Sequence, residues 1–340
     1  MSKILFILKR REDYNAKVHS HIGLSTGLYN SAKFMNDMLV EAGFNSVLEV
    51  AVDNNCIDRL VTLHKPTHVI IEALWVVPTK FSILQKLHPS VQWIVRLHSE
   101  MPFMAGEGMA MDWLVEYSKF KNIVIACNAP RMLREIKLIC GDKKVIYLPN
   151  YYPQKMVHKS FNRNKDTIDV ACFGAIRPLK NHLVQAFAAI EFAEKINKKL
   201  RFHINAGRIE MKGDAVKNNI RGLFEQISEK TGHQLINHTW TPREEFLKTC
   251  SQMDIGLQCS FSETFNIVGA DLISQGVPLV GSKEIPWSSS FFNADPTNSK
   301  EICNKLLRTY KYPQINVKLN QYQLNYYTNN TKKIWNKYFL

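Results

Sequence analysis

The feature that most constrains the fold of this chain is a repeated alternation of short apolar runs with segments of helical periodicity. In the first half the apolar runs are KILFIL (3–8), SVLEVAV (46–52), HVIIEA (68–73), QWIVRL (92–97), NIVIAC (122–127) and KVIYLPN (144–150). Short strand-like runs that alternate with helices predict a parallel sheet covered by helices on both faces.

The same alternation begins again in the second half, with IDVACFG (168–174), LRFHINAG (200–207), DIGLQCS (254–260) and VPLVGS (277–282). The segment between the halves, residues 149–166, has two prolines and no apolar period, which is typical of a linker. We predict two Rossmann-like, doubly wound α/β domains that face a cleft. Their bounds are 1–150 for the first domain, 151–166 for the linker and 167–312 for the second domain, followed by a basic C-terminal helix over 313–340.

Capping residues predict where several helices begin and end. Gly43 follows a helical segment over 29–42 and is expected to end it. A second helix is expected from about His182 to Asn197. In TPREEF, Thr241 is the predicted N-cap, Pro242 takes the first helical position and Glu244 completes a capping box.

Length and composition fit a two-domain protein of the cytoplasm. The 340 residues are 45% hydrophobic, and no uncharged apolar run reaches the ~18 residues that span a membrane. The start, MSKILFILKRRED, lacks a signal-peptide pattern and is expected to be a buried strand. We therefore predict no stable membrane insertion, whereas the oligomeric state cannot be read from the sequence.

Cysteine spacing argues against a disulfide framework. The seven cysteines are Cys56, Cys127, Cys140, Cys172, Cys250, Cys259 and Cys303. No two of them form a C-x-x-C pair, and several stand in apolar runs. Reduced thiols and the absence of a zinc site are therefore expected.

The formal charge of +14 is unevenly distributed. Residues 1–150 contain 18 basic and 14 acidic residues, and residues 151–340 contain 26 and 16. From Lys305 to Leu340 there are seven basic residues, no acidic residue and many aromatic ones. Such a surface attracts polyanions such as nucleic acid or anionic lipid, or else it is a solvated basic face that keeps the protein soluble.

In the first half, two loops after predicted strands carry candidate site residues, because ligands of open α/β sheets bind at the carboxyl ends of strands. Gly23 and Gly27 precede a helix and could present amides to an anion. The same two glycines are equally compatible with an ordinary strand-to-helix turn. The pattern is not the dinucleotide fingerprint. His98 and Glu100 follow QWIVRL directly; His98 can bind a ligand hydroxyl or have a structural role.

In the second half, FGAIRPLKNH follows the first strand and combines Gly174, Arg177 and Lys180. The glycine permits close backbone approach, and an Arg fork with a Lys point charge suits a diphosphate. Two cations at a helix start oppose the helix dipole, which favours an anion site over a solvated pair.

The segment SETFNIVGADLISQGVPLVGS (262–282) places Glu263 before a predicted helix and Asp271 on it. Positions eight apart differ by roughly 80° around a helix, so the two carboxylates can flank one ligand. Between them, the amides of Thr264, Phe265 and Asn266 lie near the helix start. Carboxylates for sugar hydroxyls and amides for phosphate together suit a sugar nucleotide.

These residues resemble the donor-site motifs of the retaining glycosyltransferases of the two-Rossmann GT-B fold, the family-4-like group. Its glycine–Arg–Lys motif matches Gly174, Arg177 and Lys180. Its two acids separated by seven residues, followed by Gly-x-Pro-hydrophobic, match Glu263, Asp271 and GVPLVGS (276–282). The second acid of the family is usually Glu, and Thr264 and Asn266 replace a glycine-rich continuation.

The resemblance implies a role for each of these residues. Arg177 and Lys180 would hold the donor diphosphate, Glu263 would meet the donor sugar, and Asp271 would meet the ribose. His98 would lie near the transferred sugar, and Gly23 and Gly27 near the phosphate or acceptor. The C-terminal helix would cross back onto the first domain.

The resemblance also implies the chemistry. The co-substrate would be a nucleotide sugar such as a UDP-sugar, with no metal and no other cofactor. The acceptor hydroxyl would attack from the front face, and the departing phosphate would take its proton.

Two acceptors are compatible with the sequence. The Asn- and Lys-rich composition and the basic, aromatic tail resemble phage-encoded members that glycosylate hydroxymethylated pyrimidines in double-stranded DNA. The loop LKRREDYNAKVHSH (8–21) would then contact the acceptor through Lys9, Arg10, Arg11, Lys17 and His21, with Glu100 nearby. The second acceptor is a lipid-linked or surface saccharide, with the basic face on anionic lipid. A non-enzymatic alternative is an inactive transferase fold that binds nucleic acid.

Overall fold

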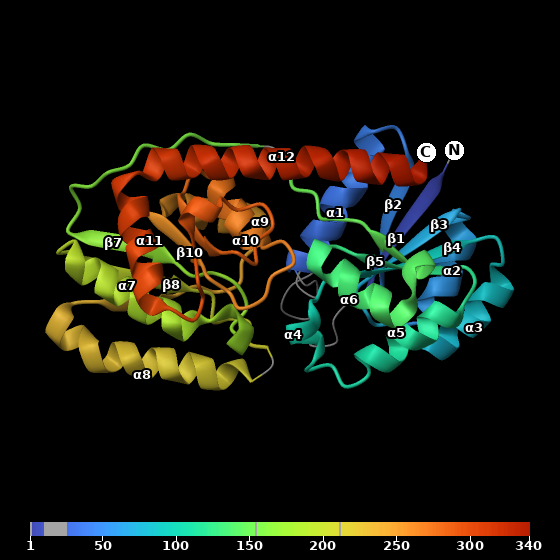
Figure 1. The fold of residues 1–340 in the computed structure, drawn as a ribbon, viewed down its shortest axis with the longest axis horizontal. Helices are drawn as coiled ribbons and strands as arrows, with labels where there is room; N and C mark the ends of the chain where they lie inside the picture. The colour runs from blue at the N-terminus through green and yellow to red at the C-terminus, as the bar shows by residue number, and fades with distance from the viewer. Residues whose placement is uncertain (1, 10–25, 154, 211) are drawn as a thin grey trace. The chain divides into compact units, whose positions relative to one another are not determined.

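Figure 1 shows the computed structural model, which describes residues 2–9, 26–153, 155–210 and 212–340. The chain forms two compact units. Unit 1 comprises the residues up to Pro153 together with Thr328–Leu340, and unit 2 comprises residues 154–327.

In the described part of unit 1, a parallel sheet has the strand order β2-β1-β3-β4-β5-β6. The strands are β1 (Lys3–Lys9), β2 (Asn45–Ala51), β3 (His68–Glu72), β4 (Gln92–Leu97), β5 (Ile123–Cys127) and β6 (Val145–Tyr147). The chain adds β2 on one side of β1 and then β3 on the other, so the strand order reverses there.

Helices cover both faces of this sheet. They are α1 (Thr26–Glu41), α2 (Cys56–His64), α3 (Pro78–Leu87), α4 (Met101–Met104), α5 (Ala110–Lys119) and α6 (Pro130–Cys140). Leu5 and Ile7 of β1 join a core with Phe81 of α3 and Leu114 of α5. Phe6 points to the opposite face and stacks on Trp335, with ring centroids 6.0 Å apart. Residue alternation along the buried strand β1 thus builds two apolar layers.

Unit 2 repeats this architecture with the strand order β12-β11-β10-β7-β8-β9, again parallel throughout its described pairs. The strands are β7 (Thr167–Ala171), β8 (Lys199–Ile204), β9 (Gln234–Asn237), β10 (Ile255–Gln258), β11 (Leu279–Ser282) and β12 (Asn293–Ala294). The order reverses between β7 and β10, which are hydrogen-bonded neighbours. Ligands of doubly wound sheets bind at such a switch point.

The helices of unit 2 are α7 (His182–Lys195), α8 (Gly213–Thr231), α9 (Arg243–Gln252), α10 (Ile267–Ser274) and α11 (Ser299–Lys311). On one face of the sheet, Phe202 of β8 packs in a core with Phe192 of α7 and Leu306 of α11. Near the other face, Phe173 packs edge-on against Phe246 of α9, 5.4 Å between centroids.

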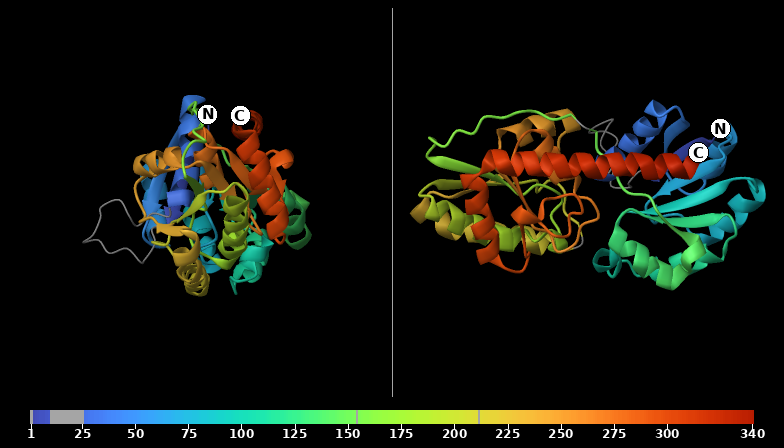
Figure 2. Two further views of the ribbon diagram at one scale, coloured as in Figure 1. Left: turned by 90° about the vertical axis from the view of Figure 1, so that its left-hand side faces the viewer. Right: turned by 45° about the horizontal axis from the view of Figure 1, so that its top comes forward.

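The last helix, α12 (Pro313–Phe339), contributes residues to both units and is continuous over 27 residues (Figure 2). In unit 2 the amide of Asn316 donates to the Leu279 carbonyl and accepts from the Leu279 N–H, both at 2.8 Å. In unit 1 the Trp335 indole donates to the Pro149 carbonyl at 2.9 Å. Specific polar contacts therefore fix the helix at both ends.

The predicted fold class, two doubly wound α/β domains, is confirmed. The C-terminal role of Gly43 is also confirmed, because it has a positive φ of 88° and its N–H donates to the Val40 carbonyl. The prediction for Thr241 is wrong: α9 begins at Arg243 with Pro242 at the cap position and no side-chain cap bond. Pro242 has a ψ of 155°, which is extended and not helical, so the helix starts one residue later than predicted.

Gly213 and Gly222 on α8 provide a matched test of packing. A Cβ at Gly213 would lie 2.1 Å from the Ile176 carbonyl oxygen, whereas one at Gly222 would meet nothing within 4 Å. We expect Gly213→Ala to lower the free energy of unfolding by about 2 kcal/mol, because backbone must move to admit the methyl group. Gly222→Ala should raise it by roughly 0.5–1 kcal/mol. Urea unfolding measures both, and equal effects of the two substitutions would contradict the packing at Ile176.

Candidate functional site

The predicted donor residues of unit 2 lie in the loops that follow β7 and β10, the two strands at the switch point. Gly174 follows β7 with φ of 122°, a conformation that L side chains rarely adopt. Its N–H donates to Asn205 Oδ1 at 3.1 Å. A Cβ here would lie 3.9 Å from Lys180 Cε, so the Lys180 side chain passes close over this glycine.

Arg177 and Lys180 border the short 3-10 helix η2 (Pro178–Lys180). Arg177 Nη1 donates to Glu210 Oε2 at 3.1 Å, and Glu210 also pairs with Arg208. The backbone of Ile176 bonds to this loop on both sides, through the Arg208 carbonyl and the Glu210 N–H. Glu210 thus lies between two guanidinium groups, an arrangement that the sequence reading missed.

Lys180, Glu263 and Asn266 form one buried polar cluster. Lys180 Nζ pairs with Glu263 Oε1, and these two side chains are only 11% and 7% exposed. Asn266 donates from Nδ2 to Glu263 Oε1 at 3.1 Å and to Gln258 Oε1 at 3.1 Å. Three residues predicted from two separate motifs are therefore in contact.

Asn266 also caps α10. Its left-handed backbone, with φ of 61°, turns the side chain so that Oδ1 accepts from the Gly269 N–H at 2.7 Å. Asn tolerates this conformation better than most residues, which explains why it can stand in place of glycine. The one side chain therefore ends the loop, starts the helix and orients Glu263.

Phe265 has a packing role. It is 3% exposed and lies against the rings of Trp287 and Tyr327, with centroids 6.0 and 5.6 Å away. Its carbonyl accepts from Trp287 Nε1 at 2.6 Å. Thr264, beside it, is half-buried. The Phe265 side chain therefore anchors the loop, and any ligand contact there would come from the backbone.

Asp271 lies on α10 and is 3% exposed. Its Oδ1 pairs with Arg243 Nη2 at 2.7 Å. Arg243 is the first residue of α9, and the sequence did not predict it to be a site residue. The predicted ribose contact of Asp271 stays a prediction, and the pair adds Arg243 to the residues to be tested.

His182 begins α7, two residues after Lys180. It is buried, and neither ring nitrogen has a hydrogen-bond partner among the described residues. Burial lowers the pKa of His182 to about 3, and the charges of Lys180 and Arg177 act in the same direction. The ring is therefore neutral near pH 7 and adds no third positive charge to this edge of the sheet.

In unit 1, His98 belongs to a buried network. Glu72 of β3 and Arg96 of β4 are direct register partners, and Arg96 Nη1 donates to both Glu72 oxygens at 3.1 and 3.2 Å. His98 Nε2 contacts the same carboxylate, and Asn128 lies 3.4 Å from His98 Nδ1. The His98 side chain is 14% exposed, so its ring lies at the edge of this network.

Electrostatics set the protonation of this network. Burial opposes ionisation of Glu72, but Arg96 and His98 outweigh it, and the pKa of Glu72 lies below its usual value. Burial lowers the pKa of His98, and Glu72 only partly counters this. Glu72 is therefore ionised at pH 7, and the neutral form of His98 is favoured.

The residues predicted to contact the acceptor are only partly described. Lys9 is the last residue of β1, and Glu100 is buried and pairs with Arg131. The remaining predictions, Arg10, Arg11, Lys17, His21 and Gly23, lie outside the described residues.

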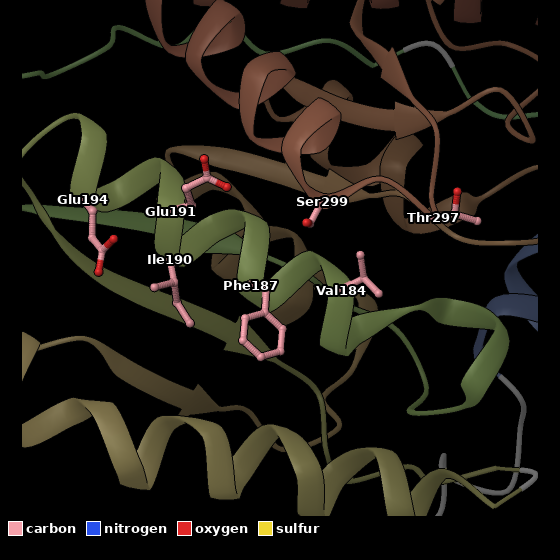
Figure 3. Close-up of a pocket in the computed structure, with 7 residues that line it drawn as sticks. All are labelled: Val184, Phe187, Ile190, Glu191, Glu194, Thr297 and Ser299. Atoms are coloured by element: carbon pink, nitrogen blue, oxygen red, sulfur yellow. The ribbon is translucent and has the colours of Figure 1, made fainter.

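A separate cavity of about 430 Å³ lies along α7 (Figure 3). It is lined by Val184, Phe187, Ile190, Glu191 and Glu194 of α7 and by Thr297 and Ser299 at the start of α11. None of the predicted donor residues lines it. Within the described residues, no cluster of three or more His, Cys, Asp or Glu side chains could hold a metal ion, and no helix could span a membrane.

No family model and no curated protein matches this chain. Solved structures do match its fold. HepE from Anabaena, in complex with UDP and glucose, aligns with a TM-score of 0.64 at 12% identity over 98% of this chain and 95% of its own. Sucrose-phosphate synthase from Thermosynechococcus elongatus aligns with a TM-score of 0.69 at 10% identity, over 99% of this chain and 98% of its own. The trehalose-6-phosphate synthase OtsA aligns with a TM-score of 0.70 at 12% identity, over 99% of this chain and 98% of its own. These likenesses establish the GT-B fold of two Rossmann-like domains.

Glu72 provides a test of the buried network. We expect Glu72→Gln to lower the free energy of unfolding by about 3 kcal/mol at pH 7, because Arg96 then stays buried without a counter-charge. A carboxylate with a lowered pKa stabilises the fold above its ordinary pKa and loses this contribution as the pH falls through the lowered value. The difference between parent and variant should therefore be constant from pH 7 to about pH 5 and shrink below it.

The matched control is Glu49→Gln on β2. Glu49 pairs with His64 at 2.7 Å, but its side chain is 33% exposed. The expected loss is below about 1 kcal/mol. Similar losses in the two variants, measured by urea unfolding, would contradict a special role for the buried pair.

Proposed function

We propose that the chain is a retaining glycosyltransferase that moves a sugar from a nucleotide-diphosphate sugar to an acceptor hydroxyl. The observation that carries this is the Lys180–Glu263–Asn266 cluster at the switch point of unit 2, with Arg177 at the other end of the same 3-10 turn. The complex of the structural neighbour HepE with UDP and glucose supports a nucleotide sugar as the donor.

Arg177 and Lys180 would neutralise the charge that grows on the leaving diphosphate. Each cation already lies against a carboxylate, Glu210 or Glu263 respectively. These contacts hold the cations in place before the donor binds, so little reorganisation is needed as charge develops. Such preorganised cations stabilise the transition state more than the ground state, which is what accelerates transfer.

Glu263 would accept hydrogen bonds from the donor sugar. Lys180 and Asn266 both donate to Glu263 Oε1. The lone pairs of Oε2 would then accept hydrogen bonds from sugar hydroxyls. Front-face attack needs no covalent nucleophile, and the departing phosphate would take the proton of the acceptor hydroxyl. His98, favoured in the neutral form and held by Glu72, would bind a hydroxyl of the transferred sugar.

Asp271 would meet the ribose, as the family resemblance implies. Because Arg243 already pairs with this buried carboxylate, a ribose hydroxyl would either share the Asp271 carboxylate with Arg243 or contact Arg243 itself. Arg243 is therefore proposed as a second contact to the nucleoside side of the donor.

The identity of the acceptor is a separate part of the proposal. Charge, composition and the 8–21 loop favour hydroxymethylated pyrimidines in DNA, but most of that loop lies outside the described residues. A lipid-linked or surface saccharide is favoured by a specific observation, an exposed apolar stripe on α12 that is described below. We therefore propose the saccharide acceptor as the leading candidate and DNA as the one to be tested against it.

The donor site is tested by Arg177→Ala and Lys180→Ala. Each should lower kcat/KM about 100-fold, since removal of one preorganised charge from a transition-state site typically costs this much. The measurement is release of nucleoside diphosphate from sugar nucleotides, with thermal unfolding to check the fold. Lys195→Ala is the control, because Lys195 is 43% exposed, lies on α7 and also pairs with a glutamate, Glu191. Turnover near the parent value in both site variants would remove this donor assignment.

The acceptor is tested by measuring the same release with hydroxymethylated duplex DNA, plain duplex DNA or no nucleic acid. We expect hydroxymethylated DNA to give no more release than plain DNA. Release that rises only with hydroxymethylated DNA, and falls steeply with salt, would instead establish DNA as the acceptor.

A further inference from the structure

The helix α12 has two unlike faces within unit 2. Its buried face carries Asn316, Val317, Asn320 and Leu324. The opposite face carries Ile315, Leu319, Tyr322 and Tyr326, which are 50%, 39%, 65% and 59% exposed. We call these four residues the α12 stripe. At ~100° per residue they fall within roughly 60° of one another around the axis, on the side away from the buried set.

The α12 stripe is apolar without interruption. Its spacing of four, three and four residues is the pattern of a helix face that packs against something apolar. At ~1.5 Å per residue it extends over roughly 17 Å. Tyr312, just before the helix, is a further exposed aromatic residue at 43%. Scattered exposed apolar side chains are ordinary, but a continuous row of them marks an interaction surface.

The surroundings of the α12 stripe are positively charged. Lys311 and Lys318 are exposed, and Arg163 donates to the carbonyls of Tyr310 and Lys311 at 2.8 and 2.9 Å. Arg308 lies 4.3 Å from the ring centroid of Phe291, which is itself 52% exposed. No acidic residue occurs from Lys305 to Leu340.

We propose that the α12 stripe docks on an anionic lipid surface. Tyr side chains place a ring in the apolar layer and a hydroxyl at the headgroups, Ile315 and Leu319 enter the acyl boundary, and the flanking lysines meet anionic headgroups. A second copy of the chain fits poorly, because two such faces would bring like charges together and α12 itself has no acidic residue to pair them. Nucleic acid fits poorly because an apolar row between the lysines would lie against a charged phosphate backbone without a polar partner for it. The helix would lie on the membrane surface.

The test is co-sedimentation of the full chain with vesicles, in the absence of nucleotide sugar so that transferase activity has no influence on the result. We expect binding to vesicles of 70% phosphatidylcholine and 30% phosphatidylglycerol, a composition of roughly one-third anionic lipid chosen to give a negative surface. A triple variant, Ile315→Gln with Leu319→Gln and Tyr322→Gln, should bind at least about tenfold more weakly. Lys311→Gln with Lys318→Gln should weaken binding to these vesicles and leave any binding to pure phosphatidylcholine unchanged.

The matched control changes three exposed apolar residues on separate helices of unit 1. They are Leu63, Ile83 and Leu138, at 68%, 52% and 82% exposed, each changed to Gln. Parent-like binding of this control together with loss in the stripe variant supports the proposal. Equal binding of parent and stripe variant overturns it. Two further outcomes overturn it. The stripe variant could abolish a dimer seen in sedimentation velocity, or abolish binding to duplex DNA, while its binding to vesicles persists.

Discussion

The interior of unit 1 depends on one buried guanidinium group. Arg96 is fully buried and donates to Glu72 of β3, to the Leu148 carbonyl after β6 and to Asn150, and it lies 5.2 Å from the centroid of the Trp335 ring of α12. Asn150 in turn accepts from Ser31 of α1. An always-charged group at this position is tolerable because β3, the segment after β6 and α12 each supply it with a partner. The same charge keeps Glu72 ionised, and Glu72 holds His98 at the end of β4.

Unit 2 also pairs buried charges, in this case at its predicted ligand edge. β7 and β10 are neighbours although the chain between them forms two more strands, so the loops after them converge. Lys180 arrives from one loop and Glu263 from the other, and Asn266 fixes the carboxylate while it caps α10. The site is therefore a direct product of strand order.

Much of this was predictable from sequence because it depends on local signals. Apolar runs predict strands, the parallel rule places their carboxyl ends at one edge, and glycine marks backbone with positive φ, as at Gly43 and Gly174. Long-range pairs gave no such signal. Glu72 with Arg96, Glu210 with Arg177 and Asp271 with Arg243 are each separated by more than twenty residues, and only the strand register or the loop packing brings them together. The shift of the α9 start from Thr241 shows that a capping motif competes with the conformation of an adjacent proline.

The α12 helix shows why a basic, aromatic tail in a sequence has no single meaning. Of its aromatic residues, Trp335 is buried against Phe6 and Tyr327 packs on Phe265, so both serve the fold. Tyr322 and Tyr326 are exposed on the side away from the sheet of unit 2 and cannot contribute to the same core. Composition cannot separate these two groups, because both contain Tyr at helical spacing. Only the position of the buried asparagines, which fix the helix to β11 and to the Ser289 N–H, decides which face is left for a partner.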